Sequence, residues 1–507
     1  MLAVVVITAK AEDGRELLGV GESDANPWIM RECVNTFGTH VVGLGIKQML
    51  LGENALEIER LWQKMYAGTY MNGRRGIVLH TMGAVEMALW DLKGKYYDKP
   101  SWQLLDRPAR PEGCITPYAS LQPEGVSTVS EYKEELCSWV GRAKQLGFRA
   151  GKCEVTLSGP YAHLGMTAGD ERITEIVAAA RDEAGDPESF QIMVDVQYTW
   201  DDAERALATL KQWGDLGVFF CETPLPLDDL DGIAQLSAQS PVRIAFGEMQ
   251  SHHSEFYDLF DRGGIQVGQP DVGRVGGLME TLKVCDMAAE RERIIVPHCW
   301  KTGVGIAATM QMAAVTPHCA YIEFLPAAIC ESELRQKLTL NDPEFVDGTL
   351  QLPSGPGLGV EVNWDCVEQY QYEKVIAENP NVAKMVAELQ VRPLMLVLLL
   401  LLLLLLLLLL LLLILLLLLL LWLLVQTRAV LATAVSDGSG SRSLEGREIV
   451  RPRQRGGCGQ PLASEAGADT TRRGARAGRP RHAARPHLAS ALAGLAPVRG
   501  PRSDSVC

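Results

Sequence analysis

Apolar residues recur along the chain as short strand-like runs, each separated from the next by a helix-like stretch. Eight runs are recognisable, at residues 115–120, 151–156, 191–197, 217–222, 243–248, 265–271, 294–298 and 321–324. Between them, apolar side chains such as Leu207, Leu210 and Trp213 are spaced three or four residues apart, which gives a helix one apolar face. Eight strands that alternate with helices predict an α/β fold with a (β/α)8-type barrel. A doubly wound open sheet is the alternative, but no glycine-rich phosphate loop follows the first strand.

The residues before this repeat follow a different pattern. Residues 4–23 contain two strand-like runs around Asp13-Gly14, which is a typical hairpin turn. Two helical stretches follow, the second of which contains AVEMALWDLKGK at residues 84–95. We therefore expect a smaller α+β capping domain in front of the barrel. The predicted order is the cap at 1–110, the barrel at 111–347 and a return from the barrel to the cap at 348–393.

Two segments of extreme composition complete the chain. Residues 394–425 are 32 apolar residues, of which 27 are Leu. As a helix they would be ~48 Å long, more than the ~30 Å hydrocarbon core of a membrane. We interpret the segment either as a membrane anchor or as a translated nucleotide repeat. Residues 426–507 are rich in Arg, Ala, Gly, Pro and Ser, and predict a disordered tail.

The charge is unevenly distributed along the chain. The net charge is −14, but the tail from residue 426 carries 14 Arg, no Lys and 6 acidic residues, so the remainder carries −22. Such an acidic body repels phosphate backbones, and we expect no nucleic-acid partner. The 12 Cys include no C-x-x-C pair, which argues against a structural zinc site or a redox motif. We expect reduced thiols and a cytoplasmic body.

Ionisable residues end six of the eight predicted strands. They are Asp195, Glu222, Glu248, Asp271, His298 and Glu323, separated by 27, 26, 23, 27 and 25 residues. A closed barrel brings such strand ends to one mouth. Because burying charged groups costs free energy unless they are paired or bind a metal, the set indicates a functional site.

Three of these residues predict a metal site. Asp195, Glu222 and Glu248 end successive strands, and three facing carboxylates repel one another unless a hard cation lies between them. A ligand set made only of oxygen suits Mg²⁺ best. The alternative is that one or two of them are helix N-caps or surface acids.

The remaining charged strand ends predict a base. The Asp271 carboxylate could accept the Nδ1 proton of His298 and make the imidazole more basic. Glu323 would lie beside them and hydrogen-bond an oxygen that gains charge. On the second strand, Lys152 could act as an acid or base with a lowered pKa, or form an ion pair with Glu154.

These residues resemble the motifs of the enolase superfamily, specifically its mandelate racemase branch. The similar motifs are AVEMALWDLKGK, VDV, CETPLP, GE, QPDVGRVGG, PHCW and YIEF, which together span the chain before the Leu run. The resemblance implies that Asp195, Glu222 and Glu248 bind Mg²⁺, that Asp271 and His298 form a basic dyad, and that Glu323 steadies the intermediate. Lys152 would then work on the opposite face of the substrate.

Within the branch, PHCWKTGVGIAA is similar to members that dehydrate sugar acids. The resemblance implies a small-molecule substrate, an aldonate or aldarate, which loses the proton next to its carboxylate and then its β-hydroxyl to give a 2-keto-3-deoxy acid. A racemase, epimerase or cycloisomerase with the same first step is one alternative. A catalytically silent metal-binding protein is another. A homo-oligomer is expected.

The sequence departs from the branch in three places. Glu154 stands where a second Lys is often the base, and Gln197 where Asn is common. A racemase needs bases on both faces, whereas a dehydratase can manage with one, so the first departure favours dehydration. The branch's first cap strand and the mobile loop after it have no counterpart, and we expect a truncated cap. Specificity should then depend on residues 22–30, Lys301 and Thr302.

Overall fold

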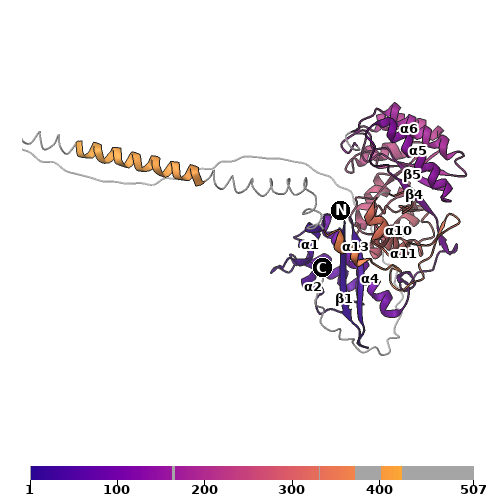
Figure 1. Cartoon of the computed structure of the whole chain (residues 1–507), viewed down its shortest axis with the longest axis horizontal. Coiled ribbons are helices and arrows are strands. Elements are labelled where there is room, and N and C mark those ends of the chain that lie inside the picture. The colour runs from indigo at the N-terminus through magenta and orange to yellow at the C-terminus, as the bar shows by residue number, and fades with distance from the viewer. Residues whose placement is uncertain (1, 163–165, 331, 372–400, 425–507) are drawn as a thin grey trace, which may run out of the picture. The chain divides into compact units, whose positions relative to one another are not determined.

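The computed structural model describes residues 2–162, 166–330, 332–371 and 401–424 (Figure 1). Its largest sheet is a curled, parallel sheet of eight strands. Its strands are β4 (Pro117–Leu121), β5 (Ala150–Glu154), β6 (Gln191–Asp195), β7 (Val218–Glu222), β8 (Arg243–Phe246), β9 (Val267–Gly268), β10 (Ile294–Ile295) and β11 (Ile322–Phe324). Their order is β10-β9-β8-β7-β6-β5-β4-β11. A parallel bridge between Ile295 and Cys319 joins the two ends, so the sheet closes. The predicted α/β barrel is confirmed, and the open-sheet alternative is wrong.

Helices alternate with these strands and cover the sheet. They are α5 (Val129–Gln145), α6 (Asp170–Ala184), α7 (Ala203–Asp215), α8 (Leu230–Gln239), α9 (His253–Tyr257) with the adjoining turn η3 (Asp258–Arg262), α10 (Leu278–Glu290) and α11 (Gly303–Ala313). The apolar face predicted for 207–216 is observed, because α7 buries Leu207, Leu210 and Trp213. Inside the barrel, a separate core contains residues from successive strands, among them Tyr118, Phe220 and Val296.

The N-terminal elements form a cap of mixed α and β structure. They are β1 (Ala3–Lys10), β2 (Glu16–Ser23), α1 (Pro27–Asn35), α2 (Ile46–Leu50), α3 (Ile58–Gly68), α4 (Ile77–Tyr97) and η1 (Ser101–Leu104). The predicted hairpin is observed, with β1 antiparallel to β2 and Gly14 at φ 90° in the turn. The hairpin packs against α4 (Figure 1). Glycine is required there, because a Cβ at Gly21 would lie 1.9 Å from the Ala84 carbonyl oxygen.

Two buried acids of α4 connect the cap to the rest of the chain. Glu86 accepts hydrogen bonds from the backbone N–H groups of Leu278 (2.8 Å) and Met279 (3.1 Å), which begin α10 of the barrel. Asp91 accepts from Val20 of the hairpin and from Leu358 after the barrel, both at 2.9 Å. These contacts fix the cap over the barrel helices that flank the strand ends.

The chain returns to the cap after β11. This part contains α12 (Glu333–Lys337), β12 (Phe345–Val346), β13 (Thr349–Gln351) and α13 (Trp364–Gln369), and a three-stranded sheet of order β12-β13-β3 with β3 (Cys114–Ile115). Gly357 accepts a hydrogen bond from Ser101 N and donates one to Lys99 O. Residues 372–393 of the predicted return lie outside the described residues, so the domain limits stay a prediction.

A separate helix covers residues 401–424. Its mean hydropathy is 3.8, and in the described part of the chain it is the one helix whose length and composition would allow it to cross a membrane. At 1.5 Å per residue its 24 residues span ~36 Å. The rest of the predicted Leu segment, 394–400 and 425, and the whole predicted tail at 426–507 lie outside the described residues.

Candidate active site

A cavity of about 490 Å³ opens at the carboxyl ends of the barrel strands. Most of its charged lining comes from residues that the sequence predicts, namely Lys152, Glu154, Asp195, Glu248, His298 and Glu323, and it also includes Arg274, Trp300 and Tyr198. Glu222 and Asp271 are completely buried and do not line the cavity, although Glu222 contacts Lys152 and Asp271 contacts His298, which do. The barrel therefore brings the predicted side chains together, in two layers.

His298 and Asp271 form the predicted dyad. His298 follows β10 and Asp271 follows β9, and Nδ1 of the imidazole lies 2.6 Å from Oδ2 of the carboxylate. The other ring nitrogen, Nε2, lies 3.5 Å from Oε2 of Glu248. An ionised Asp271 accepts the Nδ1 proton and thereby leaves the Nε2 lone pair toward the cavity.

Asp271 is kept ionised by its neighbours. Burial by itself raises the pKa of Asp271, but the Lys301 ammonium at 2.7 Å and the His298 hydrogen bond lower it to about 2. Arg274 adds a third contact, with Nε 3.8 Å from Oδ2. The carboxylate is therefore negative at neutral pH and can stabilise a positive charge on His298.

Lys152 lies among three buried acids. Its Nζ is 3.0 Å from Glu222 Oε2, 3.0 Å from Glu323 Oε1 and 3.8 Å from Asp195 Oδ2. Burial lowers the pKa of Lys152, but Glu222 and Glu323 together raise it well above its ordinary value. The ion pairs of Lys152 are with Glu222, Glu323 and Asp195 rather than with Glu154, and its role as an acid or base stays a prediction.

Glu323 is an ionised acceptor. Burial raises its pKa, but Lys152 and His298 lower it to about 2. Its oxygens accept hydrogen bonds from Ser120 Oγ (2.7 Å) and Cys299 N (2.6 Å). Both Glu323 oxygens are therefore occupied as acceptors, and its role beside a substrate oxygen that gains charge stays a prediction. Lys152, 3.0 Å from Glu323 Oε1, is a hydrogen-bond donor on this side of the cavity.

Each of the three predicted metal ligands accepts a hydrogen bond from an uncharged neighbouring side chain. Thr223 Oγ1 donates to Asp195 Oδ1 at 3.0 Å, and Gln269 Nε2 donates to Glu222 Oε2 at 2.6 Å. Tyr198 donates its hydroxyl proton to Glu248 Oε1 at 2.9 Å. Such outer contacts orient carboxylates for a cation.

The three acids do not form a closed ligand set in this structure. Lys152 lies against Asp195 and Glu222, whereas Glu248 faces His298 and Arg274. Within the described ranges, the cluster of three candidate ligand atoms within 4.8 Å of one another is a different one, formed by His252, His253 and Glu280.

The charge balance of the cavity nevertheless suits a divalent cation. Burial, and then repulsion by Glu154, raise the pKa of Asp195 well above its ordinary value. Burial and Asp195 raise the pKa of Glu222 to about 8, and burial raises that of Glu154 to about 8 as well. These acids outnumber the positive charges of Lys152 and Arg274, and a hard cation would relieve that excess.

The two departures from the family pattern lie together at this cavity. Gln197 donates to Glu154 Oε2 at 3.4 Å, and Thr156 donates to the other oxygen of Glu154. Gln197 and the next residue, Tyr198, have positive φ angles of 41° and 60°, which residues other than glycine rarely adopt. This backbone conformation accompanies the contact of Tyr198 with Glu248. Apart from the position of Tyr198 after β6, no sequence pattern predicts this contact.

The cap supplies two charged residues from the predicted specificity segment 22–30, and they contact the barrel in a way that the sequence did not predict. Asp24, just after β2, lies 2.9 Å from Lys301 Nζ, and its two oxygens accept from the Arg274 guanidinium. Glu22 accepts from Thr302 N at 3.0 Å and from the Thr302 hydroxyl. Lys301 and Thr302 were expected to contact substrate, but both are buried against the cap. Trp300 lines the cavity instead.

Comparison with known proteins was made for the whole chain. Residues 2–106 match the family model described as mandelate racemase / muconate lactonizing enzyme, N-terminal domain, and residues 136–366 match the model described as enolase C-terminal domain-like. The chain is 29% identical over 329 residues to D-galactarolactone cycloisomerase of Agrobacterium fabrum, covering 64% of this chain and 82% of the relative.

Two further relatives cover a similar part of the chain. Arabinonate dehydratase of Saccharolobus solfataricus is 29% identical over 326 residues, which are 64% of this chain and 81% of the relative. The solved structure of 3,6-anhydro-D-galactonate cycloisomerase from Zobellia galactanivorans is 26% identical with a TM-score of 0.60, covering 73% of this chain and 98% of that structure.

Proposed function

Because the chain belongs to the enolase superfamily, in its mandelate racemase branch, we propose that it is an Mg²⁺-dependent dehydratase of a sugar acid, an aldonate or aldarate. The reaction breaks the C–H bond next to the carboxylate and the C–O bond of the β-hydroxyl, and gives a 2-keto-3-deoxy acid and water. The observation that carries this proposal is the His298–Asp271 hydrogen bond of 2.6 Å at a cavity that the acids share.

His298 is the base in this proposal. Asp271 holds the Nδ1 proton, so Nε2 is free to take the proton next to the substrate carboxylate. The ionised Asp271 stabilises the imidazolium that results. The imidazolium can then donate its proton to the β-hydroxyl, which leaves as water. One group then serves both proton transfers.

Asp195, Glu222 and Glu248 would hold Mg²⁺, and the excess of buried acids around them supports this choice. When bound, the ion would neutralise the charge that builds on the substrate carboxylate as the proton leaves. Lys152 is the further donor on that side of the cavity, fixed by Glu222 and Glu323.

The residues proposed for the substrate face opposite His298 favour dehydration over racemisation. A racemase needs a second free base there, but Lys152 is held by three acids and Glu154 replaces the second Lys. A cycloisomerase is the second candidate, because a relative so named is as similar, at 29% identity, as the named dehydratase.

The test is incubation of the purified chain with Mg²⁺ and a set of aldonic acids, aldaric acids and their lactones in D₂O. A new ketone signal with one substrate supports dehydration. Deuterium uptake without a ketone indicates epimerisation, and consumption of a lactone without a ketone indicates the cycloisomerase. If no substrate reacts while the same assay detects a known dehydratase, the proposal is wrong.

We also propose that the catalytic body works in the cytoplasm. The relatives named above, which act on small sugar-derived molecules, support this. Fractionation of cells that express the full chain or a chain ending at residue 371 shows whether the 401–424 helix moves the protein to membranes. The expected homo-oligomer stays a prediction, which light scattering of either chain would check.

A further inference from the structure

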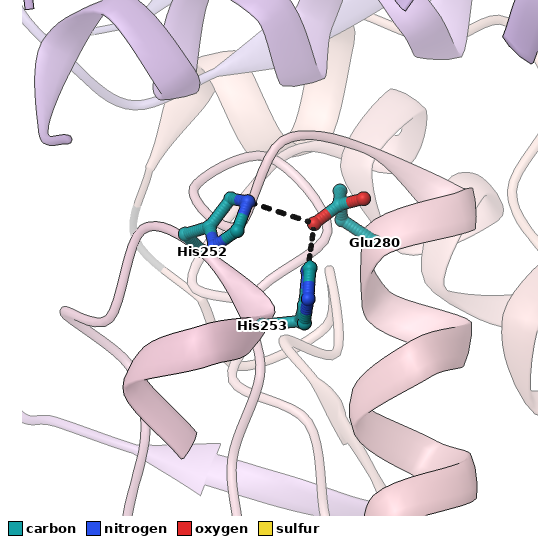
Figure 2. A group of neighbouring side chains, drawn as sticks. All are labelled: His252, His253 and Glu280. Carbon is teal, nitrogen blue, oxygen red and sulfur yellow. Dashed lines mark hydrogen bonds and ion pairs between the residues drawn. The ribbon is translucent and has the colours of Figure 1, made fainter. Parts of the chain in front are cut away.

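Three side chains outside the active site converge on one point. His252 and His253 lie at the start of α9, and Glu280 lies in the first turn of α10. Nε2 of His252 is 3.5 Å, and Nδ1 of His253 is 2.5 Å, from the same oxygen, Oε2 of Glu280. Figure 2 shows both imidazoles directed at this oxygen.

The other oxygen of the carboxylate is already paired. Glu280 is 1% exposed, and its Oε1 accepts from the Lys283 ammonium of the same helix. This contact fixes the carboxylate and leaves Oε2 for the two imidazoles. His253 keeps 26% of its side chain exposed, so an ion can reach the cluster from solvent.

The imidazole of His252 is held by its surroundings. It stacks on Tyr66 of α3 with ring centroids 5.2 Å apart and an interplanar angle of 11°. Its Nδ1 lies 2.8 Å from Ser254 Oγ. The Ser254 backbone N–H donates to Nδ1 at 3.2 Å, which places the ring proton on Nε2, facing Glu280. A metal bound at Nε2 would displace this proton to Nδ1, where the Ser254 hydroxyl can accept it, as in histidines that bind metals.

We propose that His252, His253 and Glu280 form a second metal site, which binds Zn²⁺ and joins α9 to α10. Two imidazole nitrogens and one carboxylate oxygen are a typical zinc ligand set, with a fourth position for water. Mg²⁺ prefers oxygen ligands, so this site differs in metal preference from the acid cluster in the barrel. The proposal is independent of the dehydratase assignment.

The ligand atoms are spaced for such an ion. All three lie within 4.8 Å of one another, and a metal 2.0–2.2 Å from each is compatible with that spacing after small side-chain movements. Without a metal, the same atoms form the hydrogen bond between His253 and Glu280.

The test uses the full chain, freed of metal with a chelator and kept in excess Mg²⁺ so that the barrel acids are occupied. Zn²⁺ is titrated against a chromophoric chelator, and Co²⁺ is added in parallel to report tetrahedral nitrogen ligation by its visible absorption. We expect one Zn²⁺ per chain. His253→Gln and Glu280→Gln should each weaken binding by about 100-fold or more, since loss of an outer contact alone costs 10–100-fold.

The controls separate this site from others. His40→Gln changes an exposed histidine of the cap and should bind Zn²⁺ like the wild type. Glu248→Gln changes the barrel acids and should also leave Zn²⁺ binding unchanged. The proposal fails if the wild type binds no Zn²⁺, if His253→Gln binds as tightly with unchanged circular dichroism, or if Glu248→Gln abolishes binding. His253→Gln is the milder variant, because Glu280 also holds Lys283.

Discussion

The Asp24 carboxylate, which follows the cap hairpin, lies 2.9 Å from the ammonium group of Lys301 in the barrel. Lys301 in turn lies 2.7 Å from Asp271, the partner of His298. The cap therefore reaches the catalytic dyad through a chain of buried charges. With Arg274, which pairs with Asp24 and lies near Asp271, five ionisable groups are in contact here. The removal of one charge therefore changes the electrostatic energy of the others.

Asp24→Asn should weaken both stability and turnover. Lys301 and Arg274 would lose a buried counterion, which costs about 3 kcal/mol of unfolding free energy. Denaturation at neutral pH measures this. Asp13→Asn is the matched control, because Asp13 pairs with Arg15 at the surface and its loss should leave stability almost unchanged. Equal effects of the two variants would show that the cap contact does not matter.

His298→Asn should abolish turnover but preserve folding and Mg²⁺ binding. The base would be missing while the carboxylates remain, and a general base contributes about 10²–10⁴-fold to the rate. Kinetics with the substrate found in the dehydratase assay, together with Mg²⁺ calorimetry, measure both properties. Activity within a few-fold of the wild type would contradict the dyad assignment.

Glu248→Gln should lose most Mg²⁺ affinity, because one of three carboxylate ligands becomes a neutral amide. Calorimetric titration with Mg²⁺ measures the change. Glu290→Gln alters an exposed carboxylate of α10 and should bind Mg²⁺ like the wild type. Unchanged binding by Glu248→Gln would count against the proposed ligand set.

Lys152→Met tests whether this residue is a base or a structural counterion. Glu222 and Glu323 would lose a partner 3.0 Å away, and an uncompensated buried charge costs about 3–5 kcal/mol. We expect a lower melting temperature, partly restored by Mg²⁺, whereas Lys211→Met on the exposed face of α7 should have little effect. A variant that melts like the wild type but has lost turnover would point to a base instead.

Glu154→Gln should change how stability depends on pH. Burial raises the pKa of Glu154 to about 8, so the folded chain holds this proton more tightly than the unfolded chain. Its contribution is full below the unfolded pKa near 4.5 and is lost as the pH rises to 8. Metal-free protein should lose up to about 1.4 kcal/mol per pH unit for this proton in that range. Glu154→Gln should remove the part of the pH dependence that comes from this proton. Glu188→Gln, at an exposed position, should leave the pH dependence of stability unchanged.

The sequence predicted the barrel because its information is local. Each strand is a short apolar run. Asp195 and Glu222 end β6 and β7, and Glu323 lies within β11. The periodicity of α7 and the hairpin turn at Gly14 are equally local. The carboxyl ends of parallel barrel strands lie at the same end of the barrel, so the fold alone predicted that these side chains lie close together.

The depth of each side chain and its partner could not be predicted in the same way. Lys152 and Glu154 have the same strand parity, yet only Lys152 is fixed by Glu222 and Glu323 from other strands. Asp24 and Arg274 are 250 residues apart in the chain. Their contact depends on how the cap docks through α4, which no pattern of strands and helices specifies.

The sequence by itself determined the strand order, the acids at the strand ends and the imidazole beside them, because apolar periodicity and the closure of a parallel barrel fix those positions. Only the tertiary structure decided which acids pair with Lys152, which acid pairs with His298, and that the cap charges reach the dyad. These properties depend on burial and on distances of about 3 Å between groups far apart in the chain, and Coulomb energies and desolvation change steeply over that range.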